Sequence, residues 1–348
     1  MRYQLVPENN AEARGLSANP AAAVLFDPFL PVLQARAIMA AGRFGIFEQL
    51  SESPRSAADL AGTLSLDAET LDLLLRVLAC AGYLSPQGET YQLTDRARAA
   101  LLPGSPAELT GWVKHSYLHW SLIGELEGVL KTGRGTDSHQ RMTGADAWAA
   151  YQQAMLETAR PAAGVVAEQV PVPPGARRMI DIGGGHGLYG AMICRRHPPL
   201  ICEVLELPAA IASARAMARR EGIEDVVSHR AGDAATEDLG KRVYDVAFLG
   251  NLIHHLTTDQ NRDLLARLRL CLRPGGTVAV WDFRYPEAGS PPDLVADGFA
   301  LLFRIGSSTR GISIPEYSGW MTDAGFSDVE EQRLAAPTHA LVTGRVTG

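Results

Sequence analysis

Apolar residues in the N-terminal part of the chain recur at helical spacing. Between Pro20 and Leu50 they include Leu25, Phe29, Val32, Leu33, Ala37, Ile38, Met39, Phe44 and Phe47. A spacing of three and four residues is typical of an amphipathic helix, so one or two buried helices are predicted here. Residues 1–18 are polar and show no clear period, which predicts a loose tail.

Residues 53–102 contain a series of helix and turn signals. Ser56 and Asp67 each precede an apolar periodic run, as N-terminal caps do. Two short extended pieces follow, Tyr83–Ser85 and Thr90–Leu93, and Thr94 begins another helix. This order of helix, turn, helix and hairpin predicts a winged-helix domain over residues 19–105.

The charge of this predicted domain argues against DNA binding. Residues 51–102 hold four arginines against seven acidic residues, a balance of −3, and the helix over 67–81 has three acids and one arginine. Phosphate contacts dominate DNA affinity and need a basic surface. A structural role in pairing two subunits is therefore favoured over a winged-helix regulator.

Residues 106–170 predict further helix that is rich in large aromatic side chains. His115 and His119 lie four residues apart on one helical face, but neither a third ligand nor an HExxH glutamate accompanies them. We expect no metal site. A proline-rich stretch from Pro171 to Gly175 then predicts a linker into a last domain over 171–348.

The last domain alternates strand and helix patterns. Strands are expected at 177–182, 201–206, 226–230, 243–249 and 276–283, and helices at 187–197, 208–221, 259–272, 293–305 and 315–324. Such alternation predicts a doubly wound, mostly parallel sheet. Two final segments, 328–334 and 340–346, predict a closing hairpin with an antiparallel edge strand.

Candidate cofactor chemistry follows the first three of these strands. Asp181 precedes the glycine run Gly183–Gly187, and Glu206 ends the second strand. A carboxylate at Asp181 suits the ammonium of a methionyl group and opposes a pyrophosphate, whereas Glu206 suits ribose hydroxyls in either case. The literal GxGxxG from Gly185 to Gly190 leaves a nicotinamide oxidoreductase open as an alternative.

Five motifs occur in order along this domain: Asp181–Gly187, Leu205–Pro208, Gly232-Asp233, Asn251–His255 and Leu272–Gly276. Together they resemble the S-adenosylmethionine-dependent O-methyltransferases of plant caffeate and hydroxyindole type, whose bacterial members methylate polyketide and pigment intermediates. The resemblance covers nearly the whole chain, because that family carries an N-terminal winged-helix dimerisation domain. It implies a homodimer, with S-adenosylmethionine as cofactor and S-adenosylhomocysteine as product.

The resemblance implies a set of cofactor-binding residues: Asp181, Gly183, Gly185, Gly187, Glu206, Leu207, Gly232, Asp233, Ala234, Gly250 and Asn251. His254 occupies the place of the family's base, His255 that of an aspartate beside the cofactor, and Asp282 that of one acidic partner. The second acidic partner has no counterpart in Thr309–Gly311. Transfer without a base, methylation at carbon and non-methyl chemistry therefore remain alternatives.

A further set of large side chains is expected to line the acceptor site: Trp112, Trp120, Tyr151, Met155, Trp281, Phe299, Leu302 and Phe303. Phe299, Leu302 and Phe303 share one helical face by their spacing. The set as a whole favours a flat aromatic or polycyclic hydroxyl compound as acceptor.

The bulk properties fit a globular protein. Of 348 residues, 46% are hydrophobic and 20% charged, with a net charge of −7 that gives no reason to bind nucleic acid or an anionic membrane. Four scattered cysteines indicate a reducing compartment. Neither a signal peptide nor a run of about 20 apolar residues is evident, so a cytoplasmic location is expected.

Overall fold

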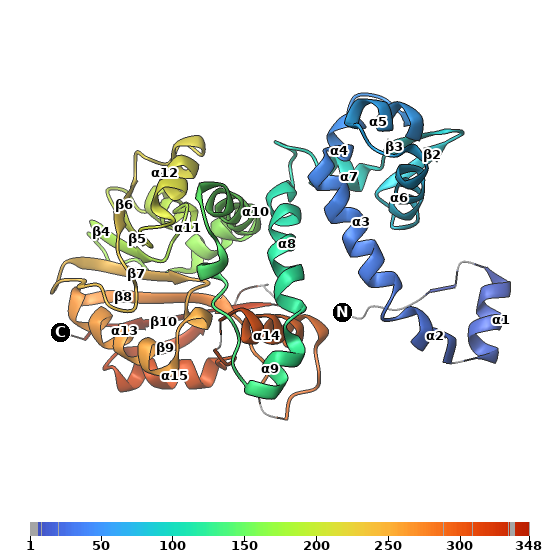
Figure 1. The fold of residues 1–348 in the computed structure, drawn as a ribbon. Coiled ribbons are helices and arrows are strands. Elements are labelled where there is room, and N and C mark those ends of the chain that lie inside the picture. The colour runs from blue at the N-terminus through green and yellow to red at the C-terminus, as the bar shows by residue number, and fades with distance from the viewer. Residues whose placement is uncertain are drawn as a thin grey trace. The chain divides into compact units, whose positions relative to one another are not determined.

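The computed structural model describes residues 6–7, 9–19, 21–287, 289–307, 309–332, 334 and 338–347. The chain divides into two compact units, one that extends to Tyr117 and one that begins at Leu118 (Figure 1). Each unit has a hydrophobic core of its own, and the two are described separately below.

The N-terminal unit consists of short helices and a small three-stranded sheet of order β1-β3-β2. Its elements are α1 (Asn10–Ala18), α2 (Ala21–Phe26), α3 (Leu30–Phe44), α4 (Ile46–Gln49), β1 (Arg55–Ser56), α5 (Ala57–Leu64), α6 (Ala68–Cys80), β2 (Leu84–Gln87), β3 (Thr90–Leu93) and α7 (Asp95–Ala100).

The predicted helix starts in this unit are confirmed by hydrogen bonds. Ser56 caps α5, Asp67 caps α6 and Thr94 caps α7, each through a side-chain oxygen that accepts from a backbone N–H three residues later. The hairpin is longer than predicted, because β2 continues to Gln87 and pairs there with Thr90. The turn therefore centres on Gly88, which has a positive φ of 60°.

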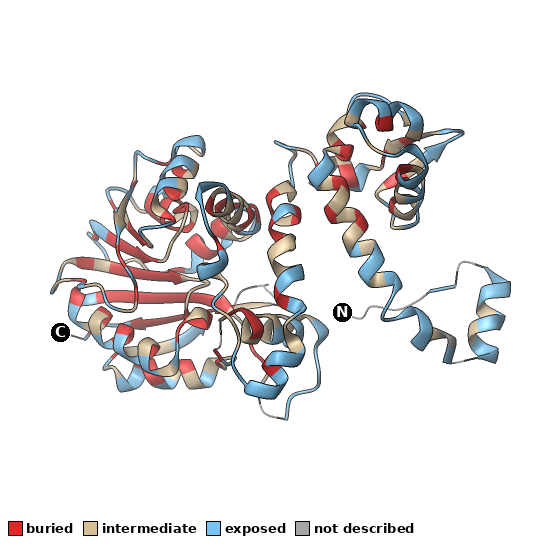
Figure 2. Cartoon of the chain, in the orientation of Figure 1, coloured by how far each residue is buried: buried red, intermediate tan, exposed pale blue. Residues whose placement is uncertain are grey.

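Two N-terminal predictions are wrong. Residues 10–18 form helix α1 and not a loose tail, because the Asn9 side chain accepts from the N–H groups of residues 11 and 12 and caps that helix. The helices over 20–50 are also less buried than expected. Leu25 is 70% exposed and Phe29 58%, and only three residues of α3 are buried (Figure 2).

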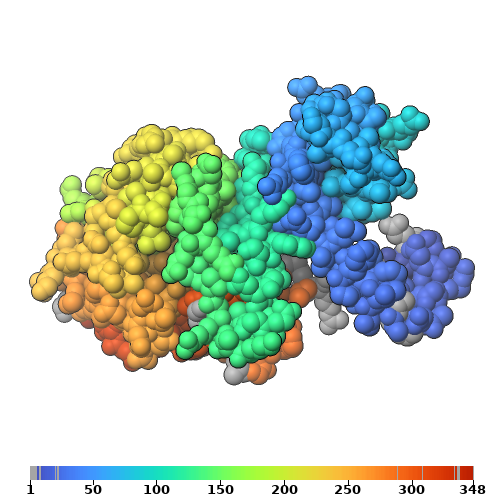
Figure 3. All heavy atoms as spheres, in the orientation of Figure 1, coloured from blue at the N-terminus to red at the C-terminus, as the bar shows by residue number. Residues whose placement is uncertain are grey.

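The exposed apolar side chains of α2, of the turn after it and of the first half of α3 form a surface that we call the N-terminal apolar face: Val24, Leu25, Phe26, Phe29, Leu30, Val32 and Leu33. In the space-filling view α1 and α2 are drawn in dark blue (Figure 3). The helical stretch over residues 23–44 would be able to cross a membrane if length and composition alone decided it. That stretch contains Asp27, Arg36 and Arg43 and is broken by a turn at 27–29.

A helical segment precedes the sheet of the C-terminal unit. It contains α8 (Thr110–Ile123), which begins in the first unit, followed by α9 (Leu126–Thr132), the 3-10 helix η1 (His139–Arg141) and α10 (Ala145–Gln169). The helical prediction for 106–170 is thus confirmed, except that the segment between α9 and α10 is mostly irregular.

The sheet of the C-terminal unit has seven strands in the order β6-β5-β4-β7-β8-β10-β9. Its strands are β4 (Arg178–Ile182), β5 (Ile201–Glu206), β6 (Val227–Ala231), β7 (Tyr244–Gly250), β8 (Leu272–Phe283), β9 (Ser327–Gln332) and β10 (His339–Arg345). The first five are parallel, β10 runs antiparallel beside β8, and β9 is an antiparallel partner at the edge. The predicted fold class is confirmed.

Helices pack on both faces of this sheet. They are α11 (Leu188–Arg196), α12 (Ile211–Arg220), α13 (Thr258–Cys271) and α15 (Ile314–Asp323), whereas α14 (Leu294–Ser307) lies against the short η2 (Ile253–His255) after β7. One core cluster joins one face to α13 and α15, and the other joins the opposite face to α10, α11 and α12 (Figure 1). Only β8 starts clearly earlier than predicted, because Leu272 already pairs with Tyr244.

Candidate active site

A glycine loop joins β4 to α11 at the carboxyl end of the sheet. Gly183, Gly185 and Gly187 have positive φ values of 65°, 55° and 82°, a region that favours glycine. A Cβ atom on Gly184 would lie 2.3 Å from the carboxyl carbon of Asp181. The loop therefore passes directly over that carboxyl group, and only glycine fits there.

The Asp181 carboxyl group accepts no hydrogen bond of good geometry among the described residues, although the backbone N–H of Gly190 lies close enough to lower its pKa. Asp181 is 1% exposed, and neither of its oxygens accepts a hydrogen bond there. Burial and the nearby Glu206 carboxylate raise the pKa of Asp181 to about 7. A buried carboxylate without a partner is costly, so this position is suited to a cationic ligand group.

Glu206 ties the second strand to the glycine loop. Its Oε2 accepts from the N–H of Gly185 at 2.8 Å and its Oε1 accepts from that of Leu207 at 2.7 Å. Burial raises the pKa of Glu206, and the two backbone N–H groups act in the opposite direction. The N–H of Gly232 donates to the Glu206 carbonyl, so the loop after β6 lies against the same strand end.

The remaining predicted cofactor residues lie on the loops after β6 and β7. Asp233 is exposed and accepts from the N–H of residue 235 as a turn aspartate does, and Ala234 is buried. Gly250 ends β7, and Asn251 has a positive φ of 54°. These residues follow strands β4 to β7, whose parallel order brings the loops to one edge of the sheet.

This donor set fits the cofactor that the sequence resemblance implies. The buried, unpartnered carboxylate of Asp181 suits an ammonium group, and the carboxylate of Glu206 suits ribose hydroxyls. A phosphate would be repelled by Asp181 at this loop. The site therefore favours an adenosyl-methionyl ligand over a dinucleotide.

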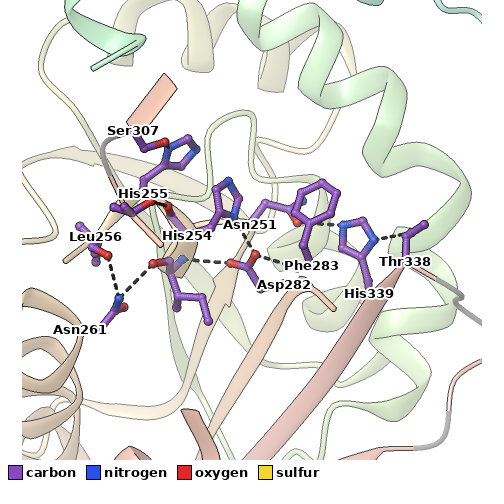
Figure 4. Close-up of polar contacts among 12 residues, drawn as sticks. Asn251, His254, His255, Leu256, Asn261, Asp282, Phe283, Ser307, Thr338 and His339 are labelled. Carbon is purple, nitrogen blue, oxygen red and sulfur yellow. Dashed lines mark hydrogen bonds and ion pairs between the residues drawn. The ribbon is translucent and has the colours of Figure 1, made fainter. Parts of the chain in front are cut away.

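A buried imidazole–carboxylate pair follows β7. Nδ1 of His254 lies 2.6 Å from Oδ1 of Asp282, which stands near the end of β8 (Figure 4). Oδ2 of the same carboxylate accepts from the N–H of Ile253 at 3.0 Å, and Oδ1 also accepts from that of Phe283. Asn261 on α13 donates to two carbonyls of the η2 turn. The His254 ring is thus held by Asp282 of β8, and the backbone on either side of it by Asn261 of α13.

The second acidic partner of the base is absent in the described part of the chain, where Asp282 is the only carboxylate hydrogen-bonded to His254. Thr309, in the segment expected to carry that acid, instead donates through Oγ1 to the His254 carbonyl at 2.5 Å. This segment therefore holds the His254 backbone and leaves its ring to Asp282.

His255 lies beside His254, with ring centroids 4.1 Å apart. Its Nδ1 lies 3.2 Å from Oγ of Ser307 at the end of α14. Burial, then the neighbouring His254 and His139 rings, lower the pKa of His255 well below its usual value. His255 is consequently a neutral imidazole at pH 7 with no carboxylate to orient it among the described residues.

Aromatic rings surround this pair. The Phe303 ring centroid lies 4.0 Å from that of His254, and Phe283 packs against both Phe303 and Phe299. Trp281 stacks on His339 with centroids 4.9 Å apart. The structure therefore brings together three of the aromatic residues predicted for the acceptor site.

The other predicted acceptor-site residues are placed less directly. Tyr151 lies on α10 beside Trp148, Met155 is half-buried one turn further on, and Leu302 is half-buried on α14. Trp120 is exposed on α8. Trp112 belongs to the N-terminal unit, where its ring lies near that of His115.

Sequence reasoning missed two rings at this site. His139 lies in η1, with its centroid 4.6 Å from that of His255, and His339 begins β10, with its centroid 4.2 Å from that of Phe283. Neither stands in a motif. Their only sequence signal is position, since His339 directly precedes the strand predicted at 340–346.

Comparison with known proteins identifies the family. An O-methyltransferase domain model matches residues 132–327, and an O-methyltransferase dimerisation domain model matches residues 32–102. The chain is 26% identical over 307 residues to 3-hydroxy-5-methyl-1-naphthoate 3-O-methyltransferase of Streptomyces sahachiroi, covering 86% of this chain and 88% of that protein. It is 28% identical to mitomycin biosynthesis 6-O-methyltransferase of Streptomyces lavendulae, covering 94% of both.

A solved structure shares the fold. An O-methyltransferase family protein from Burkholderia thailandensis superposes with a TM-score of 0.79 at 21% identity, covering 98% of this chain and 99% of that one. The family match, together with the carboxylate at Asp181, rules out the nicotinamide oxidoreductase considered from the GxGxxG spacing. The chain belongs to the O-methyltransferase family, whose members take the methyl group from S-adenosylmethionine.

Proposed function

We propose that this enzyme methylates a hydroxyl group of a small aromatic or polycyclic acceptor, with His254 as general base. The observation that carries the proposal is the buried pair of His254 and Asp282, joined at 2.6 Å. S-adenosylmethionine supplies a methyl group on a positively charged sulfur, so the protein has to position the acceptor and remove its proton.

Asp282 sets the protonation pattern of the base. Because Nδ1 of His254 donates to the carboxylate, Nε2 carries the free lone pair and can accept the proton of a hydroxyl group. Within the described residues Nε2 has no hydrogen-bond partner. Asp282 then stabilises the imidazolium that forms, as the third member of a catalytic triad does.

The cofactor is proposed to lie along the carboxyl ends of β4 to β7. Asp181 would receive the ammonium group, Glu206 the ribose hydroxyls and Asp233 the adenine amino group, with Leu207, Gly232, Ala234, Gly250 and Asn251 around them. The unpartnered Asp181 carboxylate and the crowded glycine loop support this placement. Transfer by proximity requires this site to be rigid, which the Glu206 contacts to the loop favour.

Support for the acceptor class comes from two sources. The relatives above are named for a hydroxynaphthoate and for mitomycin biosynthesis. In this chain Phe283 and Phe303 pack against His254, and Phe299 packs against Phe283, which forms an aromatic surface that suits a flat ring. We propose those members of the predicted acceptor-site set that belong to the C-terminal unit, Trp120 included, as its lining.

We further propose that the enzyme is a cytoplasmic homodimer that binds neither nucleic acid nor a membrane. The dimerisation domain match and the N-terminal apolar face support the dimer. The acidic balance and the lack of a basic helix at 67–81 support the absence of nucleic acid.

Transfer that does not depend on a base is the competing proposal. The absence of a second carboxylate beside His254 among the described residues favours it. A relative 27% identical over 321 residues is named N,N-dimethyltransferase OxyT, from Streptomyces rimosus. Methylation at carbon or nitrogen and non-methyl chemistry belong to this alternative.

The test is His254→Ala beside His255→Ala and Asp282→Asn, with methyl transfer measured on a panel of naphthols. We expect His254→Ala to lower kcat at least about 100-fold, because general-base catalysis contributes that much. Asp282→Asn should lower kcat and shift its pH profile, and His255→Ala should change kcat less. Calorimetric S-adenosylmethionine affinity serves as the control and should stay unchanged. Full turnover by His254→Ala would instead establish transfer without a base.

A further inference from the structure

Three imidazole rings lie in a row in the C-terminal unit. The ring centroid of His255 is 4.1 Å from that of His254 and 4.6 Å from that of His139. The rings of His254 and His255 are tilted by 48° to each other, and those of His255 and His139 meet edge to face at 70°, so neither pair is stacked. Two come from η2 and the third from η1, more than a hundred residues earlier in the chain.

His139 and His255 are each held at one side only. The backbone N–H of His139 donates to Oδ1 of Asp137 at 2.9 Å, and the same oxygen lies 3.6 Å from the ring nitrogen Nδ1 of His139. His255 is held through Nδ1 by Ser307. Among the described residues, Nε2 of both rings has no hydrogen-bond partner.

The row has aromatic walls. Trp148 stacks on His139 with centroids 6.0 Å apart, and Tyr151 presents its ring at 88° to His139. At the other end Phe303 contacts both His254 and His255. Within the described part of the chain, no group of three or more His, Cys, Asp or Glu side chains has an arrangement that could hold a metal ion. Free polar nitrogens between apolar rings are typical of a site for a polar aromatic ligand.

We propose that His139 and His255 recognise a second oxygen of the acceptor, adjacent to the hydroxyl that is methylated at His254. This inference rests on the proposed function and narrows its substrate class to rings with neighbouring oxygens, either two hydroxyls or a hydroxyl beside a carbonyl. Because the His255 ring lies 4.1 Å from that of His254 and 4.6 Å from that of His139, an oxygen recognised by these two rings would lie close to the hydroxyl at His254, as neighbouring oxygens on one ring require.

The charge state of His255 fits a neutral oxygen. Burial and the adjacent rings hold the pKa of His255 well below its usual value, so it offers one donor and one acceptor nitrogen near pH 7. A hydroxyl or a carbonyl oxygen satisfies such a ring. An acceptor without the second oxygen would leave the ring nitrogens unpaired in a buried site, and that loss produces the discrimination.

The test compares two probes, 2-naphthol and 2,3-dihydroxynaphthalene, for binding to the whole protein saturated with S-adenosylhomocysteine. Calorimetry on the unmodified protein should show about tenfold tighter binding of the diol, the effect of one satisfied hydrogen bond in a buried site. His139→Phe keeps the ring contacts to Trp148 and Tyr151 but removes both nitrogens. His139→Phe should reduce the ratio of diol to 2-naphthol affinity towards one and leave the affinity for 2-naphthol unchanged. His139→Gln should restore part of the preference for the diol.

A matched control is His197→Phe, at the end of α11 away from the glycine loop, which should keep the diol preference. Equal binding of the two naphthols by the unmodified protein, binding of neither, or a His139→Phe protein that keeps the full preference would each overturn the inference. The proposed base is judged separately, by the effect of His254→Ala on turnover. If His254 proves not to be the base, the binding result for His139 still stands. If His139 proves not to recognise the second oxygen, the result for His254 still stands.

Discussion

Asp181 shows how one residue can combine a folding penalty with a binding function. Its carboxyl group is fully buried, lies against Gly184 and has no described hydrogen-bond partner. Because burial raises its pKa to about 7, the protonated form dominates below that pH. Because the folded-state pKa lies above the unfolded value, ionisation of this carboxyl group destabilises the folded protein. The stability that its protonated form provides is present at low pH and is lost as the pH rises through 7.

The same shift predicts a pH dependence of cofactor affinity. An ammonium group binds the ionised carboxylate, so S-adenosylmethionine should bind about tenfold more tightly at pH 7 than at pH 5.5. In this range the amino group of the ligand stays protonated. Calorimetry across this range on Asp181→Asn should give weak binding with little pH dependence. An unmodified protein with the same affinity at both values would contradict the role of Asp181.

At the scale of elements, close packing between α11 and the sheet fixes the glycine loop. Gly190 lies in the first turn of α11, and a Cβ there would lie 2.6 Å from Sγ of Cys202 on β5 and 3.3 Å from Oδ2 of Asp181. Gly62 on α5 is also a helical glycine, but a Cβ there would meet nothing within 4 Å. The two positions separate packing from helix propensity.

We predict opposite effects of alanine at these two glycines. Gly190→Ala should lower the free energy of unfolding by about 1–3 kcal/mol, because the added methyl group overpacks the interface with β5. Gly62→Ala should raise it by about 0.5–1 kcal/mol through lower chain entropy. Urea denaturation of both variants measures the difference. Equal changes in the two would show that Cys202 moves aside without strain.

At the scale of the whole molecule, the N-terminal apolar face is left uncovered by the single chain. Its side chains keep the helical spacing that normally marks a buried face, yet Leu25 and Phe29 are more than half exposed. Exposed apolar patches of this kind mark interaction surfaces. The dimerisation domain match over residues 32–102 makes a second copy of this chain the expected partner.

We therefore predict that Phe29→Glu combined with Leu33→Glu yields a monomer, because two charges would be desolvated in the subunit interface. Light scattering after size exclusion should give twice the chain mass of 37.3 kDa for the unmodified protein and a single mass for the variant. Leu270→Glu, on an exposed position of α13, is the control and should remain dimeric. A double variant that stays dimeric would place the interface elsewhere.

The sequence by itself determined the secondary structure of the C-terminal unit and the edge of the sheet that carries the site. Periods of two and of 3.6 residues are local properties of the chain, and caps such as Ser56 and Asp67 act within three residues. Parallel strands also bring their carboxyl ends to one edge, which places Asp181, Glu206 and His254 together before any contact is known.

Only the tertiary structure decided which side chains touch. His254 and Asp282 are 28 residues apart, and their contact depends on the pairing of β7 with β8. His139 lies beside His255 because the mostly irregular segment between α9 and α10 passes there. An irregular segment has no hydrophobic period in its sequence from which this position could be predicted. Burial of the N-terminal helices was mispredicted for a related reason. Apolar spacing shows that one face of a helix is suited to burial. Only the packing of the folded chain decides whether that face is buried by the same chain or by another one.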